Sequence, residues 1–406
     1  MKEKFITYKQ QIMLFFLWLS VVSLFLIETF RALSGIAMIG FTLTGLLSTH
    51  PKNWFKNIQL NKPLLLLIVS FLVIIPSVIY SQNLEYFGIR IKILLPFLVM
   101  PFAYAQAEEF SAKQKKVISY TFIFGVLATA IQALVYYYNH QSEVNQAYLE
   151  SRVMPTAISH HPTYSLMCAF SIYLLYNAFK IEKNVNLKFF LVSITVFLVV
   201  FLHIFSVRAG LMAFYILVLL IFYEQVFLKK QLLLAGIIGL FCISIAVSTF
   251  LYSPTIRNKI ANTQNDIENY KAGGSVNNQS LGSRVISYKN AIEITQNSSW
   301  LLGCGLGDIE DLNNQLFETK YPDVTKRIIP HNQFLFYLAS LGILGLLVFI
   351  GAFYYPLVTH FKNLNLIAHY LVITVAFLIE AFLTTQLGVA FCIIFLILFI
   401  NKSRVV

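Results

Sequence analysis

The chain has 406 residues, of which 58% are hydrophobic and 12% charged, and its mean hydropathy is +0.71. This composition excludes a soluble globular protein of the same length. The 30 lysines and arginines outnumber the 18 acidic residues and give a net charge of +12. In a membrane protein such an excess is first explained by basic cytoplasmic loops, and binding of nucleic acid is the second explanation. We therefore expect an all-α polytopic integral membrane protein that contacts membrane lipid and binds no nucleic acid.

Long apolar runs recur along the whole chain. Because a bilayer offers no water to backbone groups, each run predicts a helix of about 20 residues, and we expect about 12 transmembrane helices. The runs cover about 11–28, 32–49, 63–80, 87–105, 117–138, 163–179, 189–206, 209–228, 231–252, 333–358, 364–383 and 386–401. They predict three parts: transmembrane helices over 1–252, a polar loop over 253–332, and further transmembrane helices over 333–406.

The basic residues are distributed unevenly between the two sides of these helices. Alternate loops carry mostly lysine, including Lys52, Lys113, Lys183, Lys229 and Lys362. The opposite loops, apart from residues 253–330, carry Arg31, Arg90, Lys92, Arg152 and Arg208. The positive-inside rule then places both termini in the cytoplasm and the 253–330 loop outside it.

The 253–330 loop is too long to be structureless in a compact protein. Ile256, Ile260 and Ile267 recur at nearly helical spacing, and Ser283–Thr295 has a second such pattern. Gly273 and Gly274 separate the two. We expect two short helices lying on the membrane face.

Two arginines are candidate ligands of an oxyanion. Arg208 lies in an external turn beside Gly210, where arginine rather than lysine favours bidentate binding of phosphate, although contact with lipid headgroups also explains it. Arg284 lies near the start of a loop helix, where backbone N–H groups also attract anions, and an ordinary solvated arginine is the alternative.

His331 is the candidate general base. It follows Pro330 and precedes Asn332, a residue type that caps helices well. A positive helix end disfavours imidazolium, so a neutral imidazole that accepts a proton is expected there. A histidine that is merely polar is the alternative.

Further residues are candidate substrate contacts. Arg90 and Glu380 lie inside apolar runs, where a charge needs a partner or a cavity; Arg90 would contact phosphate, and Glu380 would pair with an arginine. Arg152 and His161, beside His160, would form a second wall of an outward-facing site. The spacing of the four cysteines indicates no disulfide framework and no metal cluster. The alternating glycines in 300–308 indicate a structural turn.

Several of these segments together resemble the O-antigen ligase and O-antigen polymerase family of bacterial envelope glycan enzymes. The matching segments lie in the C-terminal half, and they are Ser206–Gly210, Gly282–Arg284, Trp300–Gly307, Pro330–Leu335, Leu341–Leu346 and Glu380 with Gln386–Val389. The segment Ser159–Tyr164 has no counterpart that we can place, which leaves the specificity for the acceptor open.

The resemblance implies glycan transfer at the outer face of the bacterial inner membrane. The donor would be a glycan on undecaprenyl pyrophosphate, and the acceptor would be lipid A-core or a second lipid-linked glycan. Arg208 and Arg284 would hold the pyrophosphate, and His331 would deprotonate or orient the acceptor hydroxyl. No metal and no cofactor are implied.

Two other classes of protein are open. A transporter or flippase of lipid-linked saccharide also needs basic residues and many helices, but it should show repeated halves and charges along a path through the membrane. Here the ionisable groups gather on one side. A structural scaffold explains the helices but gives no reason for a folded outer loop.

Overall fold

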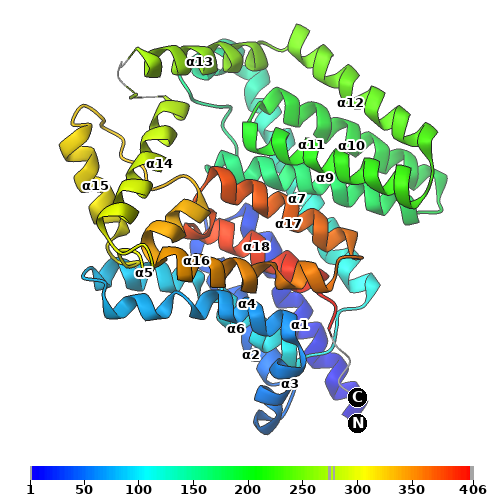
Figure 1. Cartoon of the computed structure of the whole chain (residues 1–406). Helices are drawn as coiled ribbons and strands as arrows, with labels where there is room; N and C mark the ends of the chain where they lie inside the picture. The colour runs from blue at the N-terminus through cyan, green and yellow to red at the C-terminus, as the bar shows by residue number, and fades with distance from the viewer. Residues whose placement is uncertain (1, 273–275, 278, 403–406) are drawn as a thin grey trace. The chain divides into compact units, whose positions relative to one another are not determined.

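A computed structural model describes residues 2–272, 276–277 and 279–402 of the protein. The described residues form helices joined by turns and loops (Figure 1). One isolated β-bridge is found in this part of the chain, between Ser299 and Gly303. The all-α class predicted from hydropathy is confirmed. Gly273 and Gly274, which were predicted to separate two loop helices, lie outside the described residues.

Eight helical segments in the described part of the chain are long and apolar enough to cross a membrane. A ninth results if α2 (Arg31–Leu46) and Pro51–Leu60, which is bent from it by 93°, count as one span. α17 (Leu364–Ile379) and α18 (Gln386–Phe399) are apolar but shorter. The protein is thus multi-pass, while the count of about 12 and the orientation stay predictions. The eight segments are Tyr8–Phe25, Lys62–Ile79, Leu84–Gln106, Ala112–Asn139, Val185–Phe205, Arg208–Leu228, Leu232–Tyr252 and Gln333–Thr359.

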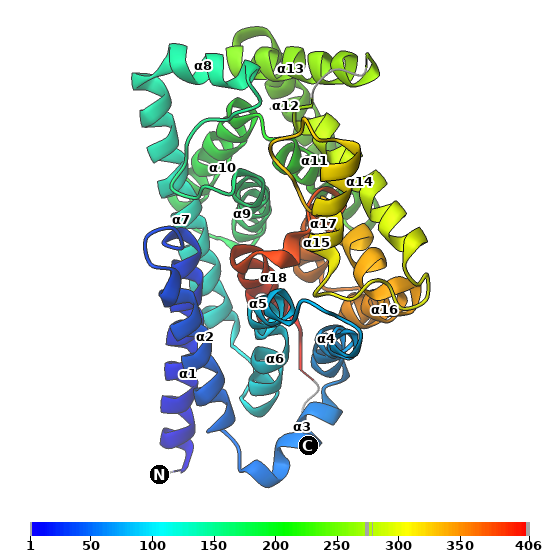
Figure 2. The ribbon, with the colours of Figure 1, turned by 90° about the vertical axis from the view of Figure 1, so that its left-hand side faces the viewer.

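The chain forms two compact units, and the first contains residues 1–121, 284–367 and 377–406. In this unit α1 (Lys2–Phe25) packs on α2, and α2 packs on α6 (Pro96–Gln106). α4 (Lys62–Leu72) contacts both α6 and α16 (Gln333–Thr359), and Figure 2 shows α4 beside α16. Residues 387–399 of α18 are all buried, so this short helix is core rather than surface.

The described residues of the first unit also contain shorter helices and three 3-10 turns. α3 (Trp54–Leu60) packs on α6, and α5 (Leu84–Leu94) precedes α6, which begins at Pro96. Proline is favoured at a first helical position because its missing N–H would have no partner there. The 3-10 turns Pro51–Asn53, Ile75–Ile79 and Phe382–Thr384 connect longer helices.

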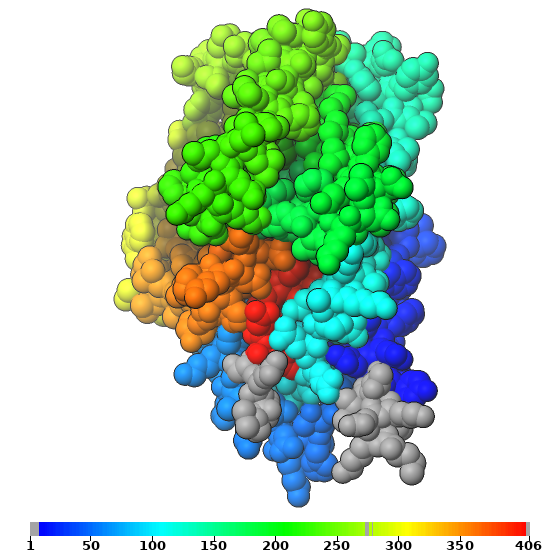
Figure 3. Space-filling view, turned by 90° about the vertical axis from the view of Figure 1, so that its right-hand side faces the viewer, coloured from blue at the N-terminus to red at the C-terminus, as the bar shows by residue number. Residues whose placement is uncertain are grey.

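The second unit contains residues 122–283 and 368–376. α10 (Val185–Phe205) and α11 (Arg208–Tyr223) pack on α9 (His161–Ile181), and residues 163–175 of α9 are all buried. α8 (Gln141–Leu149) packs on α13 (Pro254–Lys271). By contrast, only 17% of α12 (Leu232–Tyr252) is buried, and Figure 3 shows this yellow-green helix at the surface, as expected of a helix facing lipid.

The polar loop is largely helical. α13 and α14 (Ser280–Asn297) confirm the two predicted loop helices. A third, α15 (Ile309–Lys320), was not predicted; its buried residues Ile309, Asn313 and Phe317 recur every four positions, but only two of the three are apolar. α7 (Ala112–Asn139) and α14 each run from one unit into the other. The division into 1–252, 253–332 and 333–406 stays a prediction.

Candidate active site

One face of α14 points toward the segment that carries His331. Arg284, Ser287 and Tyr288 are three and four residues apart and therefore share a side of the helix. The His331 N–H donates to Ser287 Oγ at 3.3 Å, and the Tyr288 hydroxyl donates to the His331 carbonyl at 3.0 Å. Burial raises the pKa of Tyr288, so its hydroxyl keeps the proton that it donates. These two bonds fix the backbone of His331 against α14.

Glu380 lies between Arg284 and His331. Its Oε1 accepts from Arg284 Nη2 at 3.1 Å, and its Oε2 lies 3.5 Å from His331 Nε2. The side chain of Glu380 is 11% exposed, against 21% for Arg284 and 24% for His331. The predicted pairing of Glu380 with an arginine is confirmed. The carboxylate therefore compensates one fixed cation and faces a second group that becomes cationic if it takes a proton.

The ring of His331 is oriented by a backbone carbonyl. Its Nδ1 lies 2.9 Å from the carbonyl oxygen of Ile329, which can only accept a hydrogen bond. The proton of a neutral ring is therefore placed on Nδ1, and the lone pair is on Nε2. Nε2 is the nitrogen that faces Glu380, at a separation longer than an ordinary hydrogen bond. This geometry suits a base whose conjugate acid is stabilised by a nearby carboxylate.

The start of α16 holds His331 at the end of its loop. Asn332 caps the helix, as predicted, by accepting from the N–H groups of Phe334 and Leu335 at 2.9 and 3.0 Å. Its Nδ2 donates to the Leu378 carbonyl at 3.1 Å. Asn332 thus joins the start of α16 to the end of α17, two residues before Glu380.

Arg90 reaches the turn that follows Glu380. Its Nη1 donates to the Thr384 carbonyl at 2.8 Å, and its guanidinium lies 4.3 Å from the ring centre of Tyr86. Gln333 reaches the same turn, where its Oε1 accepts from Leu383 N–H at 2.8 Å. Among the described residues, the buried donors Arg90 Nε and Gln333 Nε2 have no hydrogen-bond partner. Two donors without acceptors beside this turn favour an anionic ligand.

An apolar groove of about 350 Å³ is lined by residues that are near Arg90, or near its partner Thr384, in the chain. α2, the α5–α6 junction and α18 form its walls, and it includes Lys92 and Gln386. Gln386 is two residues from Thr384, the partner of Arg90. The groove therefore combines an apolar wall with a cationic side chain near the polar turn.

Arg208 belongs to the second compact unit. It is the first residue of α11, and its Nη2 donates to Thr263 Oγ1 on α13 at 3.1 Å. Gly210 allows α11 to approach α9, since a Cβ there would lie 2.5 Å from Ser165 Cβ. The expectation that Arg208 and Arg284 hold one pyrophosphate stays a prediction.

Arg152 and His161 also lie in the second unit. Arg152 is exposed and forms an ion pair with Glu150. Burial lowers the pKa of His161 to about 4, and the nearby charges of His160 and Lys259 act in the same direction. A neutral His161 can donate or accept a hydrogen bond but supplies no positive charge to a phosphate at neutral pH.

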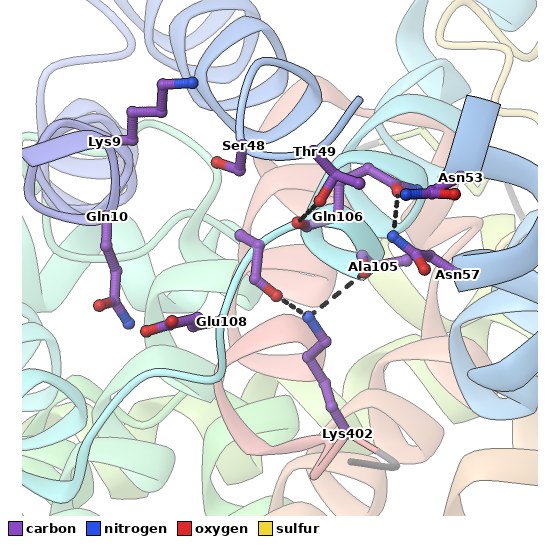
Figure 4. Close-up of a pocket in the computed structure, with 11 residues that line it drawn as sticks. Lys9, Gln10, Ser48, Thr49, Asn53, Asn57, Ala105, Gln106, Glu108 and Lys402 are labelled. Atoms are coloured by element: carbon purple, nitrogen blue, oxygen red, sulfur yellow. Dashed lines mark hydrogen bonds between the residues drawn. The ribbon is translucent and has the colours of Figure 1, made fainter. Parts of the chain in front are cut away.

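A second cavity, of about 340 Å³, lies in the first unit and is lined by α1, the α2–α3 turn, the end of α6 and Lys402 (Figure 4). Lys402 Nζ donates to the carbonyls of Tyr104 and Ala105 at 2.8 and 3.4 Å, and also to that of Ala107. The carbonyls of Tyr104 and Ala105 belong to the last turn of α6 and that of Ala107 follows it, so Lys402 adds hydrogen bonds to acceptors at the end of this helix.

Comparison with known proteins finds a similarity in the central part of the chain. Residues 191–350 match the family model described as O-antigen ligase. This part of the chain, which is less than half of it, is therefore similar to the O-antigen ligase family. No curated protein matches the chain. Proteins of the O-antigen ligase family are membrane proteins of lipopolysaccharide biosynthesis, and the family implies transfer of a lipid-linked glycan.

The matched range contains Arg208, Arg284 and His331, whereas Arg90 and Glu380 lie outside it. Glu380 nevertheless contacts both Arg284 and His331. Sequence reasoning missed Ser287 and Tyr288, which hold His331; their spacing of three and four residues from Arg284 was the available signal. In the described residues no cluster of three or more His, Cys, Asp or Glu could hold a metal ion.

Proposed function

We propose that the protein transfers a glycan from undecaprenyl pyrophosphate to an acceptor hydroxyl at the outer face of the bacterial inner membrane. The acceptor is lipid A-core or a second lipid-linked glycan. The observation that carries the proposal is the contact of one carboxylate, Glu380, with both an arginine and the lone-pair nitrogen of a histidine. A base and an anion ligand are thereby held side by side, outside the candidate membrane spans.

In the proposed reaction His331 Nε2 takes the proton of the acceptor hydroxyl. The acceptor oxygen forms a bond to the anomeric carbon of the donor, and the bond from that carbon to the pyrophosphate oxygen breaks. The electron pair of the broken bond leaves with the pyrophosphate. The imidazolium that forms is stabilised by Glu380, 3.5 Å away.

Arg284 receives the negative charge that develops on the leaving pyrophosphate. One of its five N–H groups is committed to Glu380, which orients the guanidinium and leaves other donors for phosphate oxygens. Arg90 Nε and Gln333 Nε2, which are among the buried donors without a partner in the described residues, supply further hydrogen bonds to the anion. We assign Arg208 to the same anion as a further ligand, together with contacts from Arg152 and His161 to the rest of the substrate.

The groove beside Lys92 is proposed to hold the first isoprene units of the donor lipid. Its wall is apolar, and its end at Gln386 is close in the chain to the turn contacted by Arg90. A volume of about 350 Å³ suits a short part of a polyprenyl chain, with the remainder in the bilayer. This arrangement would bring the pyrophosphate to the arginines while the tail stays in lipid.

The test is glycan transfer by the purified protein in lipid, from a polyprenyl-pyrophosphate-linked donor. We expect His331→Ala to lower the rate by about 10²–10⁴-fold, the usual contribution of a positioned general base. The matched control is His360→Ala at the opposite end of α16, where the ring lies 2.9 Å from the Asn401 carbonyl. It should keep the wild-type rate.

The products separate the two acceptors. Glycan found on lipid A-core indicates a ligase, and longer glycans on the polyprenyl carrier indicate a polymerase. Full activity of folded His331→Ala would show that another group is the base. Movement of the labelled donor across vesicles without any transfer would support a transporter instead.

A further inference from the structure

Three consecutive large apolar side chains project from the loop between α14 and α15. Trp300, Leu301 and Leu302 are 52%, 57% and 51% exposed. The Tyr80 hydroxyl donates to the Leu302 carbonyl at 2.7 Å, so an aromatic side chain lies beside them. A contiguous apolar group of this kind is unfavourable in water and usually marks a surface that another apolar phase covers.

The same loop forms hydrogen bonds with the backbone at an interruption in the candidate membrane helix α16. Within α16, Gly342 has φ +66° and ψ −175°, which interrupts the helical hydrogen bonding. The backbone groups left without helical partners on both sides of the break bond to the loop instead. These bonds are Cys304 N–H to Ala339 O at 2.9 Å, Gly305 N–H to Ser340 O at 2.9 Å, Ile343 N–H to Trp300 O at 2.8 Å and Leu344 N–H to Leu301 O at 3.3 Å.

Glycines let the two backbones touch. A Cβ at Gly303 would lie 2.5 Å from the carbonyl carbon of Ser340, and a Cβ at Gly342 would lie 2.3 Å from that of Leu301. Both glycines have positive φ, +73° and +66°. The alternating glycines, from which the sequence predicted a structural turn, thus also allow close backbone contact, and the backbone of the loop is hydrogen-bonded to the backbone of α16.

The length of α16 sets the depth of this contact. The helix has 27 residues, and the hydrocarbon core takes about 20. A stretch of about 20 that begins anywhere from Gln333 to Ser340 contains residues 340–352. The break therefore lies within the hydrocarbon if α16 crosses as one span. If only Ile343–Thr359 crosses, the break lies at the edge of the core, where tryptophan is enriched.

The surface of α16 beyond the break supports contact with lipid. Leu344, Leu347 and Val348 are 51%, 58% and 47% exposed on this candidate span. Non-helical backbone at membrane depth persists only where protein or enclosed water supplies its hydrogen bonds, and the loop supplies them here.

We propose that residues 299–305 form a re-entrant segment that enters the membrane beside α16, with Trp300, Leu301 and Leu302 in contact with lipid acyl chains. The segment follows α14 after one residue, Ser298, and precedes α15. It would therefore anchor α14, which carries Arg284 and holds His331, at a fixed depth. The proposal does not depend on which reaction the protein catalyses.

The test uses the three tryptophans, Trp18, Trp54 and Trp300. A Trp18→Phe/Trp54→Phe variant retains only Trp300 and is reconstituted into phosphatidylcholine vesicles whose acyl chains are either plain or brominated. We expect brominated lipid to quench most of the Trp300 emission and aqueous iodide to quench little of it. A Trp18→Phe/Trp300→Phe variant, which retains Trp54, provides the reference for a tryptophan outside the re-entrant segment.

Strong quenching of Trp300 by iodide, with no effect of brominated lipid, would overturn the proposal. Should the double variant fail to fold, the native chain is compared with Trp300→Phe alone. Quenching by brominated lipid should then be smaller in Trp300→Phe than in the wild type. Equal quenching in both proteins would also overturn it.

Discussion

The clearest test of the site is the substitution Glu380→Gln. Glutamine keeps the size of the side chain and one acceptor oxygen, but it removes the charge that faces both Arg284 and His331. The charge-assisted bond to Arg284 is worth about 1.5–3 kcal/mol, and the imidazolium formed on His331 loses a stabilising charge 3.5 Å away. A combined loss of about 2–4 kcal/mol in the transition state corresponds to a fall in kcat of roughly 30- to 1,000-fold.

The assay measures kcat and KM separately for donor and acceptor in the transfer reaction. If Glu380 acts through His331, kcat falls while KM for the acceptor changes little. Glu380→Asp keeps the charge and should recover part of the rate. The matched control is Glu224→Gln, which removes another buried carboxylate, paired with Lys180 and Lys229 at 2.7 and 2.9 Å in the second unit.

We expect Glu224→Gln to lower thermal stability without lowering kcat in protein that remains folded. Neutralising one partner of a fully buried pair costs about 3–5 kcal/mol, and these partly exposed pairs should lose less. A folded Glu380→Gln enzyme with wild-type kcat would refute the reasoning. A fall in kcat as large in Glu224→Gln would show that loss of any buried charge explains the effect.

Three further outcomes are expected. Arg284→Lys keeps the charge but loses the planar fork, so KM for the pyrophosphate donor should rise by about tenfold; an unchanged KM in a donor titration would contradict its role. Gly342→Ala places a Cβ against Leu301 at φ +66° and ψ −175°, a backbone region that is essentially restricted to glycine, and should lower the melting temperature, with a conformational cost of about 1–3 kcal/mol. Gly351→Ala meets nothing within 4 Å and should not lower it. Burial lowers the pKa of His161 from 6.5 to about 4, so as the pH falls the unfolded chain binds a proton at this residue before the folded chain does. The free energy of unfolding should therefore keep its full value above pH 6.5 and fall by up to about 3 kcal/mol toward pH 4. His161→Gln should flatten that part of the stability curve, and an identical curve would count against the burial of this ring.

The sequence predicted the parts of this protein that depend on local pattern or on the cost of burying charge. Apolar runs specify membrane helices, and nearly helical spacing was enough to locate α13 and α14. Glu380 could be assigned an arginine partner because an unpaired carboxylate in an apolar run is strongly unfavourable. The pattern could not say which arginine, because that depends on contacts across 96 positions of the chain.

Other features leave little trace in the pattern of apolar residues. The break at Gly342 is hidden inside a continuous apolar run, because its repair comes from backbone groups of residues 300–305. Backbone hydrogen bonds carry no side-chain period, and only the glycines indicate that two chain segments meet. Residues 284–367 belong to the same compact unit as the N-terminal helices, whereas Arg208 belongs to the other unit. This division likewise depends on long-range packing.

The location of the candidate chemistry follows from the demands of the membrane on the backbone. Inside a bilayer every N–H and C=O group must be paired, so polar groups with spare hydrogen-bonding capacity are confined to helix ends and loops. His331 precedes the cap of α16, Glu380 follows the end of α17, and Arg284 lies in the second turn of α14. Because Asn332 donates to the carbonyl of Leu378 and Tyr288 donates to the carbonyl of His331, α14, the start of α16 and the end of α17 are held together by backbone acceptors. The hydrogen bonds that complete these helix ends therefore also bring a base, its carboxylate and an anion ligand to one place.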